Sequence, residues 1–453
     1  MTLTENRELT VLDPRTDEVV ARVPVASDQR CDEAVHAARE AAAGWARTPA
    51  AERAAALHAA AADVRAAADE LAELNERETG KLRDDARGGV AAGAGTLAQY
   101  AELGPVHRGR ALHGSWDATD LMVPEPRGVV VVLTPWNDPV AVAAGLIGAA
   151  LATGNTVVHK PSERCPLTGR RFAEIVAAHL PPGVLEIVDG DGGVGALLAA
   201  APVDVVAHVG STATGRSIAQ AGARTGARVL LENGGNDPLI VDAGVDPEWA
   251  AAQAALGSFA NAGQICVSVE RIYVHAAAAD GFLAALTREA ERWAERIGPL
   301  VDRVHREHVH GHVAGALSGG ARALTGGAVP DGPGAYYPPT VLIGVQPDMA
   351  VLGEETFGPV APVRVVPDFD TALREAADDP YGLSASVLTP DMTHAQQAWR
   401  ALPVGTVKVN DVFGGAPGGA AQPRRGSGQG FGYGPELLDE MTTTKVVHIG
   451  IPG

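Results

Sequence analysis

A cysteine and a carboxylate stand in two segments whose composition suits covalent catalysis. Cys266 ends the segment Phe259-Ala-Asn-Ala-Gly-Gln-Ile-Cys266, directly after a Gly-Gln turn, and Glu232 ends the apolar run of Leu230-Leu-Glu-Asn-Gly-Gly235. A cysteine nucleophile needs activation, and the acyl intermediate that it forms needs a base to deliver water. The two segments together predict acyl chemistry on Cys266 with Glu232 as the base.

Asn137 is a candidate oxyanion donor, because it follows the continuous apolar run Val129–Leu133 in Thr134-Pro-Trp-Asn137. A run of this kind predicts a strand covered on both faces. An amide aimed at a reacting carbonyl can stabilise the oxyanion. Asn in a turn is also commonly structural, so this motif by itself leaves both roles open.

Two glycine-containing segments are candidates for a phosphate site. Gly210-Ser-Thr-Ala-Thr-Gly215 follows an apolar strand and opens a helix, whose N–H groups and positive dipole end suit a pyrophosphate. The alternative is an ordinary Ser/Thr helix cap. Gly190-Asp-Gly-Gly-Val-Gly195 matches GxGxxG, but no acidic residue ends a strand about 20 residues later, as the dinucleotide fingerprint requires. We expect a tight turn beside a cofactor pocket there.

His159-Lys160-Pro-Ser-Glu163 ends another strand, at the sheet edge where ligands of open α/β sheets bind. A carboxylate at Glu163 would accept hydrogen bonds from ribose hydroxyls and repel a 2′-phosphate, which favours NAD over NADP. The alternative is a solvated Lys–Glu pair.

Four histidines form a cluster, and His305, His308 and His312 share one helical face, with His310 beside it. Imidazoles at this spacing can bind a metal. The charged residues around them predict an exposed amphipathic helix, and neither a cysteine nor an HExxH pattern is near. We therefore favour a solvated imidazole-rich face and predict no metal site.

Composition sets the class of protein. With 453 residues the chain suggests two or three domains, and a net charge of −19 argues against binding nucleic acid. The three cysteines, Cys31, Cys165 and Cys266, are widely spaced, so neither a disulfide framework nor a thiolate zinc site is expected. The first residues lack an apolar signal core, and the apolar run from Val140 to Thr153 is too short for a membrane span. We expect a cytoplasmic protein without a membrane partner.

Strand and helix patterns alternate along most of the chain. After a predicted hairpin, Leu9–Leu12 with Glu18–Val23, the pattern is helical from Asp28 to about Tyr100 and less so from Gly104 to Glu125. The predicted elements that follow are strand Val129–Leu133, a Gly/Ala-rich helix, strand Thr156–His159, helix Leu167–His179, strand Val184–Val188, Leu197–Ala200, strand Val203–Val209, helix Arg216–Arg224 and strand Arg228–Glu232. This alternation predicts a doubly wound α/β domain.

A second α/β region is predicted from about Gly234 to Asn410. The glycine-rich stretch Gly414–Gly434 is a long loop, either ordered or flexible, and the tail Thr442–Ile449 has β character.

With these residues in place, the chain resembles the aldehyde dehydrogenase superfamily from Leu9 to Val447. Eight motifs occur in the family order: Glu78-Thr-Gly-Lys81, Thr134-Pro-Trp-Asn137, Lys160-Pro-Ser-Glu163, Gly210-Ser-Thr-Ala-Thr-Gly215, Glu232-Asn-Gly-Gly235, Gly263-Gln-Ile-Cys266, Glu354-Glu-Thr-Phe-Gly-Pro359 and Gly405-Thr-Val-Lys-Val-Asn410. Each motif is short, but their shared order is specific.

The resemblance implies a role for each residue. Cys266 would form a thiohemiacetal with the aldehyde, Asn137 and the Cys266 N–H would hold the oxyanion, NAD would take the hydride, and Glu232 would activate water against the thioester. The implied cofactor contacts are Lys160, Ser162 and Glu163 at the adenosine ribose, Trp136, Gly210, Ser211 and Gly215 at the phosphates, and Glu355 and Phe357 at the nicotinamide ribose. Glu232 favours hydrolysis, since members that acylate coenzyme A or act on acyl phosphates typically lack this carboxylate.

The implied architecture is α/β, with two Rossmann-like doubly wound domains and a small β oligomerisation element. The expected parts are an NAD-binding domain of residues 1–106 and 125–233, a catalytic domain of 234–412, and an oligomerisation element of 107–124 and 413–453. The tail would extend a neighbour's sheet, so a homodimer or homotetramer is expected. The alternatives are a catalytically silent NAD-binding or structural protein of the same fold and a CoA-acylating semialdehyde dehydrogenase.

The chain departs from the family pattern around the aldehyde pocket. Asn236 replaces a lysine, Asp138 stands where an aromatic residue is usual, Ala420-Ala-Gln-Pro423 replaces Pro-Phe-Gly-Gly, and Phe431-Gly432 replaces Arg-Glu. We therefore expect a polar substrate, including a cationic one, near Asp138. The alternative is that Asp138 pairs with a nearby arginine.

Overall fold

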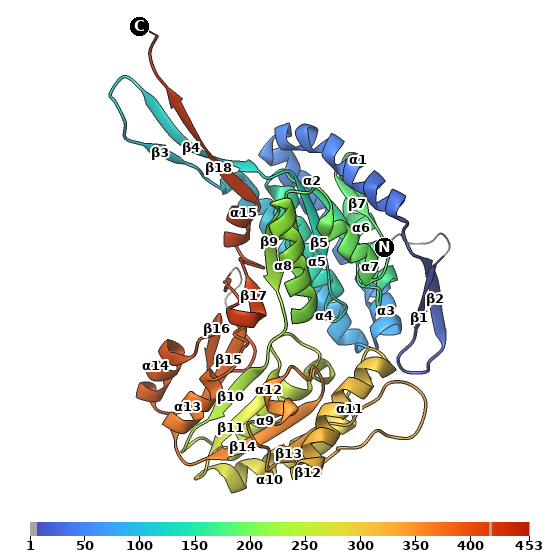
Figure 1. Ribbon diagram of the computed structural model, residues 1–453, viewed down its shortest axis with the longest axis vertical. Helices are drawn as coiled ribbons and strands as arrows, with labels where there is room; N and C mark the ends of the chain where they lie inside the picture. Colours follow the sequence, from blue (N-terminus) through green and yellow to red (C-terminus); the bar gives the residue numbers. More distant parts are fainter. Residues whose placement is uncertain (1–6, 416–418, 453) are drawn as a thin grey trace.

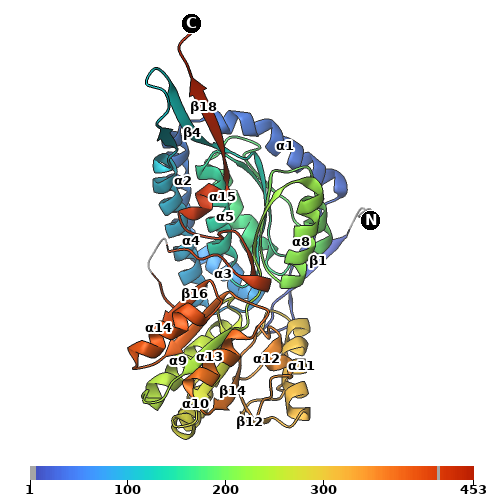
Figure 2. The same ribbon diagram turned by 60° about the vertical axis from the view of Figure 1, so that its left-hand side comes forward.

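The computed structural model describes residues 7–415 and 419–452. Figures 1 and 2 show two sheet-and-helix units, one above the other, and a narrow β arm that projects from the end of the upper unit. The two units carry separate hydrophobic clusters, so each sheet has a core of its own. The predicted fold class, with two α/β sheets and a small β element, is confirmed.

The upper unit is built on a six-stranded sheet in the order β17-β9-β8-β5-β6-β7. Its strands are β5 Val129–Leu133, β6 Thr156–Lys160, β7 Leu185–Ile187, β8 Val205–Val209, β9 Arg228–Glu232 and β17 Gly428–Gln429. All pairs are parallel except β17 with β9, which is antiparallel. The parallel strands lie within a residue or two of their predicted positions.

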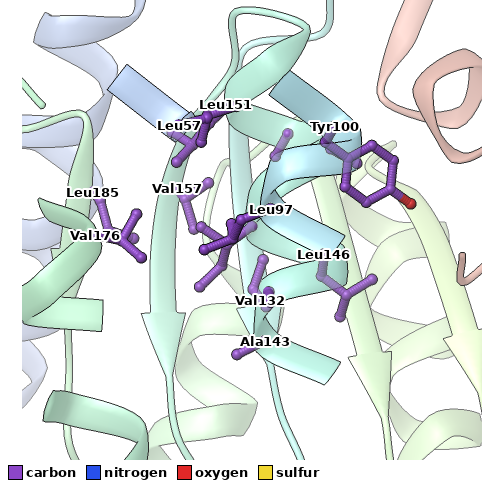
Figure 3. Packing of buried hydrophobic residues seen from close by; sticks show 14 of the residues in the cluster. Leu57, Leu97, Tyr100, Val132, Ala143, Leu146, Leu151, Val157, Val176 and Leu185 are labelled. Atoms are coloured by element: carbon purple, nitrogen blue, oxygen red, sulfur yellow. The ribbon is translucent and has the colours of Figure 1, made fainter. Parts of the chain in front are cut away.

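Alternation along β5 explains why helices cover both faces of this sheet. Val130 and Val132 enter one hydrophobic cluster, with Leu97 and Leu146 (Figure 3), and Val129 and Val131 enter the cluster on the opposite face. Successive side chains of a strand point to opposite faces, so an all-aliphatic strand needs apolar partners on both. The helices of this unit are α1 Asp28–Arg47, α2 Ala50–Ala66, α3 Ala68–Thr79, α4 Arg83–Leu103, α5 Pro139–Ala152, α6 Pro166–Ala177, α7 Gly192–Ala200 and α8 Thr212–Thr225.

The lower unit is built on a seven-stranded sheet in the order β12-β13-β14-β11-β10-β15-β16. Its strands are β10 Asp237–Val241, β11 Val269–His275, β12 Arg322–Thr325, β13 Thr340–Ile343, β14 Val360–Val366, β15 Ser384–Leu388 and β16 Thr406–Val409. Its helices are α9 Pro247–Phe259, α10 Ala279–Ala294, α11 Arg303–Ser318, α12 Ala350–Gly353, α13 Phe369–Ala377 and α14 Met392–Ala401. Only β12 runs antiparallel to its neighbour, so most strands of this sheet too end at one edge.

The projecting arm is an antiparallel sheet of β3 Arg110–Leu112, β4 Thr119–Pro126 and β18 Thr442–Ile449. It joins the excursion near residue 110 to the tail, which confirms the β character predicted for the tail (Figure 1). The short helix α15 Glu436–Glu440 leads into β18, and β1 Glu8–Leu12 pairs with β2 Val19–Pro24 as the predicted hairpin. Single helical turns, η1 Gly104–Val106, η2 Ala260–Gly263 and η3 Arg425–Ser427, complete the described elements.

Two sequence predictions need comment. Helix α7 begins at Gly192 rather than near Leu197, because the Asp191 carboxylate accepts the N–H of Gly193 at 2.9 Å and caps the glycine-rich start. The glycine-rich stretch Gly414–Gly434 is described except for residues 416–418, and its later part includes η3 and β17. Among the residues that the structure describes, no helix combines the length and the apolar character needed to cross a membrane.

Candidate functional site

A cavity of about 240 Å³ lies where the two units meet, next to the ends of β5, β8 and β9. It brings together most of the residues predicted for catalysis and cofactor binding. Its lining residues are Pro135, Trp136, Asn137, Arg164, Val209, Gly210, Ser211, Glu232, Asn233, Gly234, Cys266, His305, His308, Glu355 and Phe357. Lys160, Ser162, Glu163 and Gly215 do not line this cavity.

Cys266 is presented by a turn with unusual backbone geometry. Asn261 and Ala262 have φ of 49° and 56°, which is uncommon outside glycine, and Gly263 has φ of 73°. The buried Gln264 side chain holds this turn, since its Oε1 accepts the N–H of Val301 at 2.9 Å and its Nε2 donates to the carbonyl of Asn261 at 3.0 Å. Strained backbone persists only where its surroundings over-determine it, as they do here.

The Cys266 thiol and the Glu232 carboxyl both line the cavity and are close enough to interact with each other. Burial raises the pKa of the thiol well above 9.0, and the carboxylates of Glu232, Asp237 and Glu355 raise it further. Burial also raises the pKa of Glu232, while its interaction with Cys266 lowers it. Cys266 is therefore a neutral thiol, and the Glu232 carboxyl is close enough to receive its proton.

Asn137 lies beside the turn that carries Cys266. Its Nδ2 donates to the carbonyl of Gln264 at 3.1 Å, and its own carbonyl accepts the Lys81 ammonium at 3.2 Å. The same ammonium lies 3.4 Å from the Asp138 carboxylate, which packs against the bare backbone of Gly89. Asp138 thus pairs with a lysine rather than with an arginine, and it stands outside the residues that line the cavity.

The predicted phosphate segment provides a helix start at the cavity. Ser211 is the N-cap of α8, with its Oγ accepting the N–H of Thr214 at 3.3 Å. A Cβ on Gly215 would lie 1.9 Å from Oδ1 of Asn233, so only glycine lets α8 approach the end of β9 this closely. The N–H of Gly210 donates to the carbonyl of Glu232 at 3.0 Å. The N-cap of α8 therefore lies at the wall of the cavity, next to Glu232.

The Lys160–Glu163 segment follows β6 and is tied to the second glycine-rich segment. The Lys160 ammonium, almost fully buried, donates to the carbonyls of Pro161 at 2.7 Å and Gly190 at 2.9 Å and lies 3.5 Å from Glu163. Burial lowers the pKa of Lys160. Glu163 is exposed, and the buried Ser162 Oγ accepts the N–H of Arg164 at 3.3 Å. Gly190 thus lies against Lys160, in the loop between β7 and α7.

The loop of Glu355 and Phe357 is fixed by a carboxyl that the sequence analysis missed. Glu270, buried in β11, accepts the N–H of Thr356 at 2.6 Å and of Phe357 at 2.9 Å. The Glu355 carboxyl accepts the N–H of Gly235 at 3.1 Å, and burial raises its pKa to about 7. The available signal was a Glu-Arg pair inside an otherwise apolar strand, since buried charges are retained where they have partners.

The histidine face of α11 packs partly on the site, so the prediction of a solvated face is wrong for His305 and His312, whereas His308 is exposed. His305 and His312 are each 9% exposed. The His305 Nε2 lies 2.7 Å from the carbonyl of Phe357, and its ring meets the Trp136 ring edge-on at 5.7 Å. Burial lowers the pKa of His305 to about 4, so its imidazole is neutral at physiological pH. The loop that Glu270 holds covers this face, a tertiary contact that helical periodicity does not reveal.

His308 and Arg164 also line the cavity, and neither was predicted to do so. Arg164 lies over the Trp136 ring at 5.3 Å and pairs with Asp302 at 2.9 Å. Within residues 7–415 and 419–452, no group of three or more His, Cys, Asp or Glu side chains is arranged to hold a metal ion.

Comparison with known proteins identifies the family of this site. The model of the aldehyde dehydrogenase family matches residues 2–447. Lactaldehyde dehydrogenase of Escherichia coli (strain K12) is 34% identical over 97% of this chain and 94% of the relative. A betaine aldehyde dehydrogenase of Cereibacter sphaeroides is 35% identical over 97% of this chain and 93% of the relative. The solved structure of an NAD-dependent aldehyde dehydrogenase from Sinorhizobium meliloti superposes with a TM-score of 0.95 at 35% identity, covering 99% of this chain and 92% of that one.

Proposed function

The chain belongs to the aldehyde dehydrogenase family, and we propose that it oxidises a polar aldehyde to the free carboxylic acid with NAD as the oxidant. The observation that carries the proposal is that Cys266 and Glu232 line the same cavity as Asn137 and the start of α8. A nucleophile, a base and an amide donor in one cavity are what the conversion of an aldehyde to an acid requires.

The first step is addition of the Cys266 sulfur to the aldehyde carbon. The raised pKa of the thiol means that its proton must leave as the S–C bond forms, and Glu232 is an acceptor close enough to take it. The aldehyde oxygen becomes an oxyanion, for which the Asn137 amide and the Cys266 backbone N–H are the donors. Asn137 Nδ2 must then turn from the Gln264 carbonyl toward that oxyanion.

The residues on the cofactor side fit NAD. The start of α8 offers free backbone N–H groups, Gly215 lets that helix approach β9, and the rings of Trp136 and Phe357 meet edge-on at 5.5 Å in the cavity wall. Bound NAD supplies the hydride acceptor. Gly210 and Ser211 would hold the phosphates, and Trp136 would lie against them.

The adenosine end and the nicotinamide end of NAD would be held by separate groups of residues. Lys160 ends β6 and Ser162 and Glu163 follow it, and the exposed Glu163 carboxylate would accept the ribose hydroxyls and disfavour a 2′-phosphate. Glu355 and Phe357 would contact the nicotinamide ribose, in the loop that Glu270 fixes.

The last step is hydrolysis of the thioester. Glu232 must first release to solvent the proton that it took from Cys266. It then takes a proton from water, the hydroxide oxygen adds to the acyl carbon, and the C–S bond breaks, so that the carboxylic acid leaves and the Cys266 thiolate regains a proton from Glu232. This step needs Glu232 deprotonated, so its raised pKa places the activity above the ordinary carboxyl range.

The substrate class is the least constrained part of the proposal. Asp138 stands next to Asn137, its side chain is 36% exposed, and its Oδ1 has no hydrogen-bond partner among the described residues. The Lys81 ammonium already offsets its charge. Because the charge of Asp138 is already balanced, and Asp138 stands outside the residues that line the cavity, the arrangement argues against a cationic substrate. The relatives named for lactaldehyde and betaine aldehyde represent a hydroxy-aldehyde and a cationic aldehyde, and we propose a hydroxy-aldehyde.

The arm supports an oligomer. In the described chain β18 pairs only with β4, so its other edge is open to strand addition. We propose a homodimer or homotetramer assembled through residues 107–124 and 413–453, with an NAD-binding domain of 1–106 and 125–233 and a catalytic domain of 234–412. All three cysteines are free, which supports a cytoplasmic location.

The direct test is NADH formation by the purified protein with a panel of hydroxy-, amino- and simple aliphatic aldehydes, with NAD or NADP and with or without coenzyme A. We expect NADH with NAD, fastest with hydroxy-aldehydes and independent of coenzyme A. No NADH in any condition would refute the proposal, and a strict need for coenzyme A would indicate acyl transfer. Cys266→Ala should abolish turnover, whereas Asp138→Phe should lower only the preference for hydroxy-aldehydes.

A further inference from the structure

His208, near the end of β8, is a buried side chain whose polar atoms are unpaired. It is 8% exposed, and within residues 7–415 and 419–452 neither its Nδ1 nor its Nε2 has a hydrogen-bond partner. A neutral imidazole carries one N–H donor and one acceptor nitrogen. Buried polar groups are nearly always paired, so two unpaired nitrogens on one buried ring indicate a polar partner that is not part of the chain.

The His208 ring faces the side of the six-stranded sheet that α7 and α8 cover. Its register partners on β5 and β9 are Leu133 and Leu231, and both belong to the hydrophobic cluster of that face. Figure 2 shows α8 and α5 on opposite sides of this sheet. Lys160 is the register partner of Leu133 on β6, so its side chain leaves the sheet on the same face as His208. One row across the strand ends therefore carries an ammonium and an imidazole among apolar neighbours.

The ring lies against the loop that starts α8. A Cβ on Gly210 would lie 2.7 Å from Cε1 and 2.9 Å from Nε2 of His208, so the bare backbone of Gly210 lets the ring stand there. Burial, together with the Lys160 ammonium, lowers the pKa of the imidazole to about 4, although the Ser211 backbone acts to raise it. The ring is therefore neutral at physiological pH and close to Ser211, the N-cap of α8.

The other groups on this face do not offer the ring a partner. The Lys160 ammonium already donates to the carbonyls of Pro161 and Gly190. The residues that α8 buries have no polar side chains; they are Gly215, Ile218, Ala221 and Gly222. What lies next to the unpaired imidazole is the start of α8, where backbone N–H groups and the positive end of the helix dipole suit a phosphate.

We propose that His208 is a further cofactor-binding residue, whose neutral imidazole donates an N–H to the diphosphate of NAD at the start of α8. This inference rests on the cofactor side of the proposed function, because it assumes that Gly210 and Ser211 hold that diphosphate. The phosphate oxygens supply the acceptor that the buried N–H lacks in the free protein. The unpaired ring is destabilising while the protein is free of cofactor, and binding removes this penalty.

The test is His208→Phe, which keeps a ring of similar shape and removes both nitrogens. Because an apolar ring replaces an unpaired polar one, we expect the Tm of the free protein to stay the same or to rise. The Kd of NAD and of ADP, measured by calorimetric titration, should rise by roughly ten- to a hundredfold, with no loss of kcat at saturating NAD. A histidine with a structural role alone would show the opposite pattern, a lower Tm of the free protein and a wild-type Kd.

His159→Phe is the matched control, because His159 is a fully buried histidine on the opposite face of the same sheet. Its Nε2 lies 2.9 Å from Thr134 Oγ1, so its loss should lower the Tm of the free protein and leave the Kd of ADP at the wild-type value. His208→Gln restores a donor and should recover part of the affinity for ADP. Adenosine, which has no phosphate, should bind the wild type and His208→Phe equally.

The outcomes separate this inference from the proposed function. If the wild type forms NADH but His208→Phe binds NAD and ADP as the wild type does, the inference is wrong and the proposed function stands. An equal loss of affinity for adenosine and ADP would also overturn it, since the ring would then pack against the nucleoside. If His208→Phe loses affinity as expected but no aldehyde yields NADH with the wild type, the inference holds and the proposed oxidation fails. If the wild type binds neither NAD nor ADP, both proposals fail.

Discussion

The two parallel sheets meet at one cavity but are built from different side chains. In the six-stranded sheet, the whole of β5 is aliphatic, and its valines are fully buried on both faces. In the seven-stranded sheet, the strand ends nearest Cys266 carry buried charges, with Asp237 4% exposed, Glu270 5% and Arg271 2%. The contrast lies in what each sheet must hold in place.

The aliphatic six-stranded sheet needs only to be rigid. The groups that it presents to the cavity are backbone N–H groups and turns beyond the ends of its strands. The buried ionisable residues of the seven-stranded sheet, Asp237, Glu270 and Arg271, form what we call the charged layer. This layer fixes two loops whose side chains are candidates for a role in the reaction. Glu270 holds the Glu355–Phe357 loop, and the Arg271 guanidinium bonds the Asn236 carbonyl at 2.7 Å and lies 3.2 Å from Asp379. A buried ionic group costs free energy unless it is fully paired, so its presence here indicates positioning rather than stability.

The largest expected effect is on the charged layer itself. Glu270→Ala leaves two buried N–H groups without acceptors, so we expect the free energy of unfolding to fall by about 3 kcal/mol and the KM for NAD to rise. Urea denaturation and NAD titration measure the two effects. Glu270→Gln keeps one acceptor oxygen and should lose less. A variant with wild-type KM would show that the loop does not depend on Glu270.

The same layer predicts a pH dependence at Cys266. Because the pKa of the thiol is raised well above 9.0, the thiolate fraction should grow by about tenfold per pH unit between pH 7 and 9. Alkylation by iodoacetamide, followed by mass spectrometry of the Cys266 peptide, measures this fraction. Asp237→Asn removes one of the carboxylates that raise the pKa and should speed alkylation at pH 7. A rate that is flat over this range would contradict the neutral resting thiol.

The aliphatic sheet should respond in stability alone. Val131→Ala leaves a void in a strand that is buried on both faces, and we expect the free energy of unfolding to fall by about 2 kcal/mol. The kcat and the KM for NAD should stay at the wild-type values once the protein is folded. A change in either constant at full folding would break the contrast between the two sheets.

The smallest expected effect concerns Lys81, whose ammonium contacts Asn137 and Asp138 in the turn after β5. Lys81→Met removes the ammonium that donates to the Asn137 carbonyl, so we expect kcat to fall by roughly tenfold with little change in thermal stability. Steady-state kinetics with the best aldehyde measures the loss. Asp138→Asn keeps the hydrogen-bonding oxygen near Lys81 and serves as the matched control. Equal losses in the two variants would indicate that the ion pair, rather than the bond to Asn137, matters.

The sequence predicted the parts of the site that are continuous in the chain. A motif such as Gly263-Gln-Ile-Cys266 contains both the proposed nucleophile and the Gln264 that holds its turn, so local order was enough to find it. The parallel strands were predicted for a similar reason. A short all-apolar run such as Val129–Leu133 is typical of a strand that is covered on both faces.

The contacts that were missed join segments far apart in the chain. The histidine spacing on α11 predicted the helix, but not that the loop held by Glu270 would cover its face. In the same way, the glycine at position 432 was visible as a departure from the family pattern, without any sign that it lies against Glu232.

By itself, then, the sequence predicted the candidate groups: a cysteine, a carboxylate, an amide and a helix start on an α/β framework. The tertiary structure decided how they stand, with Cys266 beside Glu232 in one cavity, Asp138 paired with Lys81 and His305 buried against Phe357. The physical reason is that periodicity and motif order report local backbone preference and burial. The pKa of a thiol and the place of a carboxylate depend on charges and walls supplied by other segments.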